Sequence, residues 1–300
     1  MVSRRLQSNG DGGNDRGRDR AQLILIGAIT LAFIILGLVV VVNSVLLTET
    51  LSSEDSGRSG SDAATVEYDI EQGIAGIAHR GNLRWGNDTP SDYNEKLRAV
   101  VEDGNGFRRQ YQNVTGNSRP VIVDISVDGV PEDQQAKAKS DEPIPNGTVN
   151  NGSDSKVGHL SLNLQYDGTG DNVTVYRNGT GSESIEITGA SLPDGDGFNI
   201  TDEDGEICTV RNERAEIDLV TGAVNATVDG SCDRQFIDPD VPTSPRIEGD
   251  TNMGTYDIVT RADLSDGSDA AWAVDVTVTY DSSDVSYERP YRVFLYGDRS

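Results

Sequence analysis

The most prominent pattern in the sequence is a run of apolar residues near the amino terminus. No charged side chain occurs between residues 22 and 48, and the segment from Leu23 to Leu47 is mostly Leu, Ile, Val, Ala and Gly. As an α-helix this segment is about 37 Å long, which exceeds the roughly 30 Å hydrocarbon core of a bilayer. A helix also satisfies its own backbone polar groups in lipid. We therefore predict a transmembrane helix over residues 21–48.

Two alternatives to a membrane span are less consistent with this run. The apolar region of a cleaved secretory signal is only about 7–15 residues long and ends at a small-residue cleavage site. Here the run is longer, and the sequence that follows it, Leu46-Leu47-Thr48-Glu49, has no such site. A buried helix in a soluble protein is the other alternative, and the length of the uncharged run disfavours it.

Charges on the two sides of the predicted span indicate its orientation. Residues 1–20 contain five arginines against three aspartates, whereas acidic residues follow the span before the first basic residue, Arg58. Basic residues next to a span favour the cytoplasmic side. We predict a disordered cytoplasmic lead over residues 1–20, a tether over residues 49–62, and an extracellular carboxy-terminal domain held at the cell membrane.

A helical pattern follows the tether. In residues 63–118, apolar side chains recur at spacings of three and four residues, which is typical of an amphipathic helix; the first stripe is Val66, Ile70, Ile74 and Ile77. A second stripe begins after the start signal Pro90-Ser91-Asp92. It contains Tyr93, Leu97 and Val100 or Val101, and continues through Phe107 and Tyr111. We predict a helical region over residues 63–118.

The period of the pattern changes to two after Pro120, which indicates β-strands. Alternation is clear in the segments VIVDISV, HLSLNLQY, VTVY, SIEIT, EICTVR, TYDIVTR and WAVDVTVTY. The last of these forms a predicted hairpin with VSYERPYRVFLY, where Pro290 suggests an edge strand or a bulge. Residues 129–156 and 238–254 are predicted connections. The expected fold is α+β, with an antiparallel sheet or sandwich over residues 119–300 and apolar positions for one core.

Charge narrows the range of partners and environments. The chain has 50 acidic and 25 basic residues, a net charge of −25, which opposes nucleic-acid binding. Lysine occurs only at Lys96, Lys137, Lys139 and Lys156. Such a charge repels itself in a compact state, and molar salt screens the repulsion. The composition is similar to that of halophilic archaeal proteins; an ordinary acidic extracellular protein is the alternative.

Asparagine-x-Ser/Thr sequences, which are acceptors for N-glycosylation, occur eight times. The asparagines are Asn87, Asn113, Asn146, Asn151, Asn172, Asn178, Asn199 and Asn225. Around Asn225, the alternation in AVNATV places Asn225 and Thr227 outward if the valines face inward. We predict glycosylation of at least some of these sites; the alternative is that Asn, Gly and Thr only mark turns.

The two cysteines, Cys208 and Cys232, both follow the predicted span. An extracellular environment favours a disulfide between them. The intervening segments RAEIDLV and AVNATVDG, with a turn at Thr221-Gly222, predict a hairpin that this disulfide would staple. A metal site is disfavoured because the sequence has no C-x-x-C motif and no histidine near these residues.

Little in the sequence points to catalysis. The chain has two histidines; we predict His79 on the surface of a helix and His159 at the start of a strand. No G-x-S-x-G, P-loop, G-x-G-x-x-G or H-E-x-x-H motif occurs. The acidic segment LPDGDGFNITDEDGE is predicted to be a solvated loop, with Ca²⁺ ligation as the alternative; its acids are Asp194, Asp196, Asp202, Asp204 and Glu206. We expect no enzyme activity, no catalytic residues, no cofactor, no resident metal and no small-molecule substrate.

The junction between the lead and the apolar run resembles a known signal. Arg20-Ala21-Gln22-Leu23 lies at the cytoplasmic edge of the run and resembles the class III signal of archaeal pilins and archaellins. That resemblance implies cleavage between Ala21 and Gln22 by a prepilin-type peptidase, with the helix retained. The wider segment is similar to the amino terminus of haloarchaeal pilin-like surface proteins. Ile26 stands where bacterial pilins carry a glutamate, which archaeal members often omit.

Two interpretations of function remain open from the sequence. In the first, the processed helix packs with pilin-like subunits in a type IV pilus-like filament, of which this chain is a minor subunit. In the second, the helix is a plain anchor in membrane lipid, and the glycosylated domain is a non-assembling binding module of the cell envelope.

Overall fold

The structure, a computed structural model, covers the carboxy-terminal part of the chain. It describes residues 62–297 apart from residues 86–88, 119–120, 151–154, 167, 169–171, 179–182, 194, 231, 233, 265 and 284. Contacts divide the chain into two units, residues 1–62 and residues 63–300. The predicted lead (residues 1–20), span (residues 21–48) and nearly all of the tether therefore lie outside the described residues. Within the described part, no helix has the length and apolar character needed to cross a bilayer.

The first described element is a helix over residues 62–84. Its buried stripe consists of Val66, Ile70, Ile74 and Ile77. These positions recur every three or four residues, so they share one face of the helix. The prediction of a helix here is confirmed.

The second predicted helical stripe is divided between two helices, α2 (Pro90–Glu102) and α3 (Phe107–Ser118). Thr89 and Asp92 form a capping box at the start of α2, because each side chain accepts a hydrogen bond from the other's backbone N–H. The stripe breaks at Gly106, where an added Cβ would lie 2.7 Å from a backbone carbonyl oxygen of α2. A residue with a side chain would therefore not fit this close turn.

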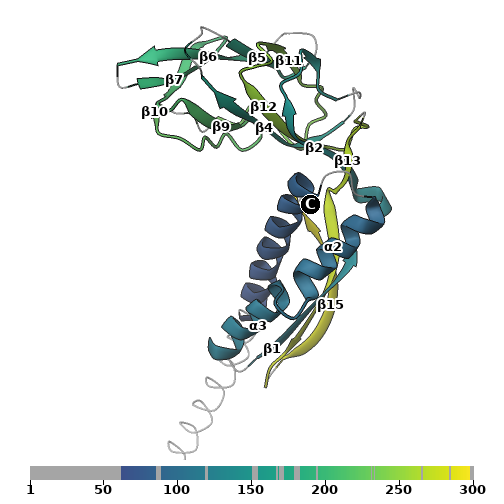
Figure 1. The fold of residues 1–300 in the computed structure, drawn as a ribbon. Coiled ribbons are helices and arrows are strands. Elements are labelled where there is room, and N and C mark those ends of the chain that lie inside the picture. Colours follow the sequence, from purple (N-terminus) through teal and green to yellow (C-terminus); the bar gives the residue numbers. More distant parts are fainter. Residues whose placement is uncertain are drawn as a thin grey trace, which may run out of the picture. The chain divides into compact units, whose positions relative to one another are not determined.

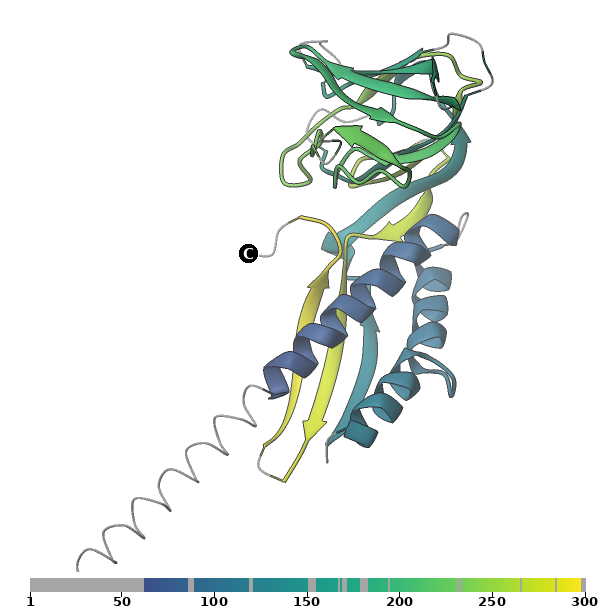
Figure 2. The same ribbon diagram turned by 90° about the vertical axis from the view of Figure 1, so that its left-hand side faces the viewer.

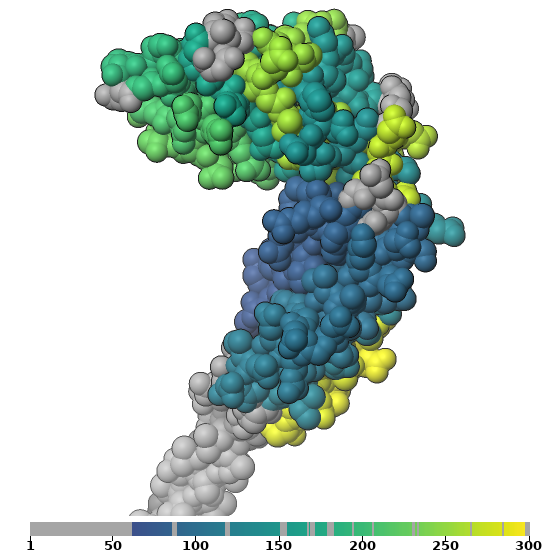
Figure 3. Space-filling model, viewed as in Figure 1, coloured from purple at the N-terminus to yellow at the C-terminus, as the bar shows by residue number. Residues whose placement is uncertain are grey.

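These helices cover one face of a three-stranded antiparallel sheet (Figures 1 and 2). The strands are β1 (Ile122–Gly129), β14 (Ala273–Asp281) and β15 (Ser286–Phe294), in the order β1-β14-β15. In the space-filling view the helices, in purple and blue, hide most of the yellow strands behind them (Figure 3). The buried face of the sheet is supplied by alternate residues, as predicted; these include Val123, Ile125, Val127, Val274, Val276, Val278 and Tyr280.

Side chains from the helices cover part of the free edge of β1. The Arg98 Nε donates to the Val127 carbonyl oxygen at 2.9 Å, and the Glu102 Oε1 accepts from the Val127 N–H at 2.6 Å. Farther along β1, the Gln112 Nε2 donates to the Val123 carbonyl oxygen at 2.8 Å. Unpaired edge groups are a template for another strand, so these hydrogen bonds oppose pairing at this edge.

The other edge of this sheet is β15, which pairs only with β14. Pro290 lies on β15 opposite Thr277. Proline has no N–H to donate to a neighbouring strand, so the predicted edge position of Pro290 is confirmed.

Two larger antiparallel sheets make up the rest of the described chain (Figure 1). The seven-stranded sheet has the order β10-β8-β7-β6-β5-β11-β3 and the five-stranded sheet the order β13-β2-β12-β4-β9. The first consists of β3 (Gly147–Thr148), β5 (Asn172–Tyr176), β6 (Ser184–Leu192), β7 (Gly195–Asp202), β8 (Gly205–Val210), β10 (Val228–Gly230) and β11 (Arg246–Gly249). The second consists of β2 (Gln135–Pro143), β4 (Val157–Gln165), β9 (Arg214–Asp218), β12 (Gly254–Thr260) and β13 (Ser268–Ala271). A short 3-10 helix, η1 (Glu132–Gln134), precedes β2.

The fold class is α+β with mostly antiparallel sheets, as predicted, but the single core is wrong. Among the described residues, buried apolar side chains form three clusters. The largest contains residues of both larger sheets, and the second joins the helices to the three-stranded sheet. The third is small and brings Trp272 and Tyr296 against Ala136, Ala138 and Val259.

Three predicted connections or loops contain strands. Residues 129–156 include β2 and β3, residues 238–254 include β11, and the acidic segment includes β7. In β2 the inward positions are Ala136 and Ala138, whose small side chains give a weak alternating signal. In β7, Phe198 and Ile200 face the core among glycines and aspartates.

Candidate functional site

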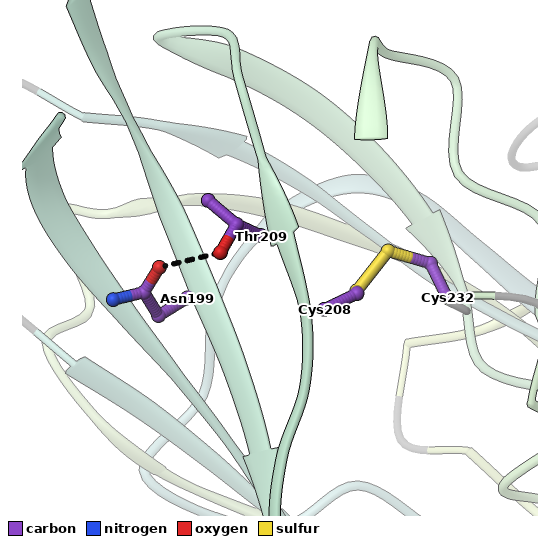
Figure 4. Close-up of a disulfide and its surroundings, with 4 residues drawn as sticks. All are labelled: Asn199, Cys208, Thr209 and Cys232. Atoms are coloured by element: carbon purple, nitrogen blue, oxygen red, sulfur yellow. Dashed lines mark hydrogen bonds between the residues drawn. A yellow bond between two sulfur atoms is a disulfide. The ribbon is translucent and has the colours of Figure 1, made fainter. Parts of the chain in front are cut away.

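The predicted disulfide is confirmed. Cys208 on β8 is bonded to Cys232, with the two Cα atoms 5.3 Å apart (Figure 4). Cys208 lies opposite Gly230 of β10, so the bond joins β8 to the segment that follows β10. Cys208 is buried in the largest core cluster and Cys232 packs against it.

The hairpin predicted between the cysteines forms only in part. The turn after β9 closes through a hydrogen bond from the Asp218 N–H to the Ala223 carbonyl oxygen at 2.8 Å. The chain then leaves β9, and Val228–Gly230 pairs with β8 instead. The alternation predicted around Asn225 is nevertheless confirmed. Outward positions are Asn225 and Thr227, and those packed against the core are Val224, Ala226 and Val228.

Removing this disulfide should weaken the fold measurably. The bond closes a loop with a sequence separation of 24 residues, for which the chain-entropy relation gives about 3.5 kcal/mol. We expect the Cys208→Ser, Cys232→Ser double variant to lose that much unfolding free energy in denaturant titrations at molar salt. The control is the oxidised parent chain, and equal midpoints for the two would contradict a structural role.

Six of the eight predicted glycosylation acceptors lie among the described residues; Asn87 and Asn151 lie outside them. The exposed ones are Asn113 on α3, Asn146 before β3, Asn172 at the start of β5, Asn178 after β5, and Asn225 after β9. Asn199 on β7 is half-buried. The predicted processing residues Arg20, Ala21, Gln22 and Leu23 lie outside the described residues.

The acidic segment predicted as a loop is instead the β7–β8 hairpin. Asp202 ends β7 and is ion-paired with Arg234. Asp196 lies near the other end of the same strand, where it accepts a hydrogen bond from Ser191, and Asp194 lies outside the described residues. Among the residues that the structure does describe, no three His, Cys, Asp or Glu side chains gather as metal ligands.

The structure brings the chain's two histidines together. His79 on the helix over residues 62–84 and His159 on β4 have ring centroids 5.0 Å apart, in a T-shaped contact. His159 is 6% exposed and His79 is partly buried, so the predicted surface position of His79 is wrong. We call the group formed by these histidines with Asn82, Asp218 and Tyr296 the histidine cluster.

Hydrogen bonds connect Asn82, Tyr296 and His79 within the histidine cluster. Asn82 Nδ2 donates to Tyr296 Oη at 3.0 Å, and Tyr296 Oη lies 2.8 Å from His79 Nδ1. Because a hydroxyl can both accept and donate, Tyr296 Oη can accept from Asn82 and donate its own hydrogen to the Nδ1 of a neutral His79. Burial raises the pKa of Tyr296, so the hydroxyl keeps its proton.

Burial also keeps the other histidine neutral. It lowers the pKa of His159, against the raising effect of Asp218, Asp257 and Glu216. His159 Nδ1 lies 3.8 Å from Asp218 Oδ2, which is too long for a hydrogen bond, and a neutral ring makes no ion pair. His159 Nε2 is buried and has no hydrogen-bond partner within the described structure.

The pKa of His79 is lowered to about 4. Burial is the largest cause, the neighbouring His159 and Arg80 lower it further, and Asp218 opposes them. Two neutral imidazoles in contact can accept protons as the medium turns acidic. The histidine cluster can therefore act as a proton-sensitive contact between the first helix and β4.

Sequence patterns gave no signal for this cluster. The two histidines are 80 positions apart, and Tyr296 comes from the segment after β15. Tyr296 packs against Gly158, the residue before His159. An added Cβ at Gly158 would lie 2.3 Å from the tyrosine ring, so this packing explains the glycine.

A separate groove of about 570 Å³ lies between the first helix and the turn from α2 to α3. Gly73, Ile77 and Phe107 are among its apolar lining residues, and Arg80 and Asp103 are among the charged ones. Arg80 and Asp103 can orient a polar group, but this lining suggests no specific reaction.

Comparisons with protein-family models, with curated proteins and with solved structures find no match for this chain.

Proposed function

We propose that the chain is a membrane-anchored, pilin-like surface protein that serves as a minor subunit of a type IV pilus-like filament. The apolar segment over residues 21–48 forms the anchor and, after processing, the helix by which copies associate. The observation that carries the proposal is the order of elements. A charged-to-apolar junction at Arg20-Ala21-Gln22-Leu23 is followed by a long uncharged run, then by a helix packed on an antiparallel sheet.

The edges of the three-stranded sheet support association through helices. The side chains of Arg98, Glu102 and Gln112 form hydrogen bonds with backbone groups at the edge of β1. On the other edge, Pro290 leaves β15 without a backbone N–H at that position. Addition of a neighbour's strand needs free edge groups. Copies that cannot extend this sheet would instead associate through the apolar segment, where close packing of helices needs no free strand edge.

The charge distribution supports an extracellular position for residues 63–300. Five arginines lie before the predicted span, and such residues favour the cytoplasmic side. The disulfide between Cys208 and Cys232 is also typical of chains outside the cytosol.

Sequencing the mature amino terminus tests the proposal. We expect the chain purified from membranes to begin at Gln22. An Arg20→Gln variant should accumulate unprocessed, because the resemblance places a basic residue before the cut. An Arg18→Gln variant removes the same charge two positions earlier and should be processed normally.

Shearing of cells provides the second measurement. Filaments released by shear should contain the processed chain, and the Arg20→Gln variant should be missing from them. A chain that retains Met1 or Val2 and stays in the membrane would instead support the plain anchor, the second interpretation.

A further inference from the structure

Two glycosylation sequences that are distant in the chain lie side by side on the seven-stranded sheet. Asn172 on β5 is paired with Thr188 on β6, and Thr188 is paired with Asn199 on β7. Two residues away on β6, Glu186 is paired with Thr174 of β5 on one side and with Thr201 of β7 on the other. These are the threonines of the two acceptor sequences. Because β5 and β7 are both antiparallel to β6, the two Asn-x-Thr sequences run in the same direction.

Both asparagines lie on the outer face of this sheet. Their strand neighbours Val173, Val175, Phe198 and Ile200 are buried in the largest core cluster. Side chains alternate between the two faces of a strand, so the residues between these neighbours point away from the core. Asn172 and Asn199 are separated by one intervening strand, or about 10 Å at the usual strand spacing.

Hydrogen bonds orient both amide groups on this face. Thr209 Oγ1 on β8 donates to Asn199 Oδ1 at 3.2 Å, which leaves the Asn199 nitrogen on the other side of the amide (Figure 4). Asn172 Nδ2 donates to Glu186 Oε1 at 2.7 Å. An amide nitrogen carries two hydrogens, so this bond leaves one for replacement by a sugar.

The composition of the face argues against a protein partner. Large exposed apolar side chains among the described residues are Tyr68, Val100, Val114, Ile122 and Val241. None of them lies on β5, β6, β7 or β8. Interfaces between proteins usually have an apolar centre. The outward side chains of β5, β6 and β7 are mainly short polar or acidic ones, and Tyr176 at the end of β5 is in contact with Arg246.

We propose that Asn172 and Asn199 carry N-linked glycans side by side, so that the outer face of the seven-stranded sheet is covered by sugar. This inference rests on the proposed function for the extracellular position of the domain. The two glycans would exclude neighbouring copies from this face and leave the helices and the three-stranded sheet for contacts between copies.

The reaction transfers a sugar to each asparagine from a lipid-linked glycosyl phosphate donor. The Asn Nδ2 forms a bond to C1 of the sugar as the bond from C1 to the phosphate oxygen breaks. The lipid phosphate leaves with that electron pair, and the amide proton passes to a base of the transferase. No oxidant or reductant takes part.

Glycopeptide mass spectrometry on the full-length chain tests the inference. The chain is produced in a haloarchaeal host whose own surface glycoprotein serves as the positive control, and the membrane and cytosolic fractions are analysed separately. Cleavage after Arg177 separates Asn172 from Asn178, and cleavage at acidic residues separates Asn178 from Asn199. We expect glycan on Asn172 and on Asn199, and an intact mass that shows both on one molecule.

Matched variants make the assignment specific. Asn172→Gln and Asn199→Gln should each remove the mass of one glycan. Thr188→Val changes the residue between them without touching either acceptor sequence, and should leave both glycans. Unmodified Asn172 and Asn199 peptides in membrane-located chain would overturn this inference and leave the anchor intact. Recovery of the chain only from the cytosol would instead overturn the proposed function.

Discussion

The full-length chain should lose its folded structure when salt is lowered from molar concentration to about 0.1 M. Its net charge of −25 opposes compaction through self-repulsion. The screening length rises from about 3 Å at 1 M to about 10 Å at 0.1 M. Because folded domains are stable by only about 5–15 kcal/mol, this rise can unfold the chain. Circular dichroism in detergent, recorded during dialysis, measures the loss; an unchanged spectrum would contradict the expectation.

The outer face of the three-stranded sheet shows why the screening length matters. Asp124 and Glu288 both pair with Thr279, from the strands on its two sides. They are therefore about two strand spacings, or roughly 10 Å, apart. At molar salt this separation is about three screening lengths, and at 0.1 M it is about one. Carboxylates at such spacings therefore repel one another much more strongly in dilute salt than in molar salt, although Asp124 also has a cationic neighbour, Arg108, at 3.6 Å.

Variants on this face distinguish charge from other effects of salt. Asp281 ends β14 and Glu288 lies near the start of β15, so both are exposed on this face close to the turn of the β14–β15 hairpin. An Asp281→Asn, Glu288→Gln variant should unfold at a lower salt concentration than the parent. The matched Asp281→Glu, Glu288→Asp variant keeps both charges and should unfold at the parent's concentration.

Local patterns predicted the elements whose buried side chains are large. The stripe of Val66, Ile70, Ile74 and Ile77 defined the first helix, because large apolar residues at spacings of three and four have one common face. The alternation of Leu160, Leu162 and Leu164 defined β4 in the same way. The disulfide also followed from the sequence, because only two cysteines were available to pair.

Elements with small or polar side chains were missed, as was everything that depends on distant contacts. The strand β2 buries Ala136 and Ala138, and its alternation is too weak to distinguish from a connection. The histidine cluster depends on residues from the first helix, β4 and the end of the chain. No local sequence pattern predicts this cluster, because only the packing of these separate elements brings its residues together.

Acid should destabilise the chain through the histidine cluster. The pKa of His79 is about 4 in the folded chain and about 6.5 in an unfolded one. A lowered folded pKa means that the unfolded chain binds the proton more tightly. The contribution to stability is therefore complete above pH 6.5, is lost as the pH falls towards 4, and changes no further below that.

The size of the acid effect follows from burial. For His79 the shift corresponds to at most about 3 kcal/mol, and partial exposure reduces this to roughly 2 kcal/mol. Burial also lowers the pKa of His159, so protonation of this ring destabilises the folded chain further. Asp218, Asp257 and Glu216 offset part of that cost, since they favour the charged ring. The expected loss is about 2 kcal/mol from His79, with a further loss from His159.

A chain without histidine isolates this effect from the titration of carboxylates. The double variant is His79→Asn, His159→Leu. The asparagine amide oxygen can accept a hydrogen bond from Tyr296 in place of the His79 Nδ1. The leucine removes the buried His159 Nε2, which has no hydrogen-bond partner within the described structure. Denaturant unfolding at molar salt, from pH 7 to pH 4, gives the stability of both chains. Since their carboxylates are the same, the difference between the two curves reports on the imidazoles and on their coupling to the neighbouring carboxylates. We expect the parent to lose at least about 2 kcal/mol more than the variant, mostly between pH 6.5 and 4. Parallel curves would show that the histidine pair does not respond to protons.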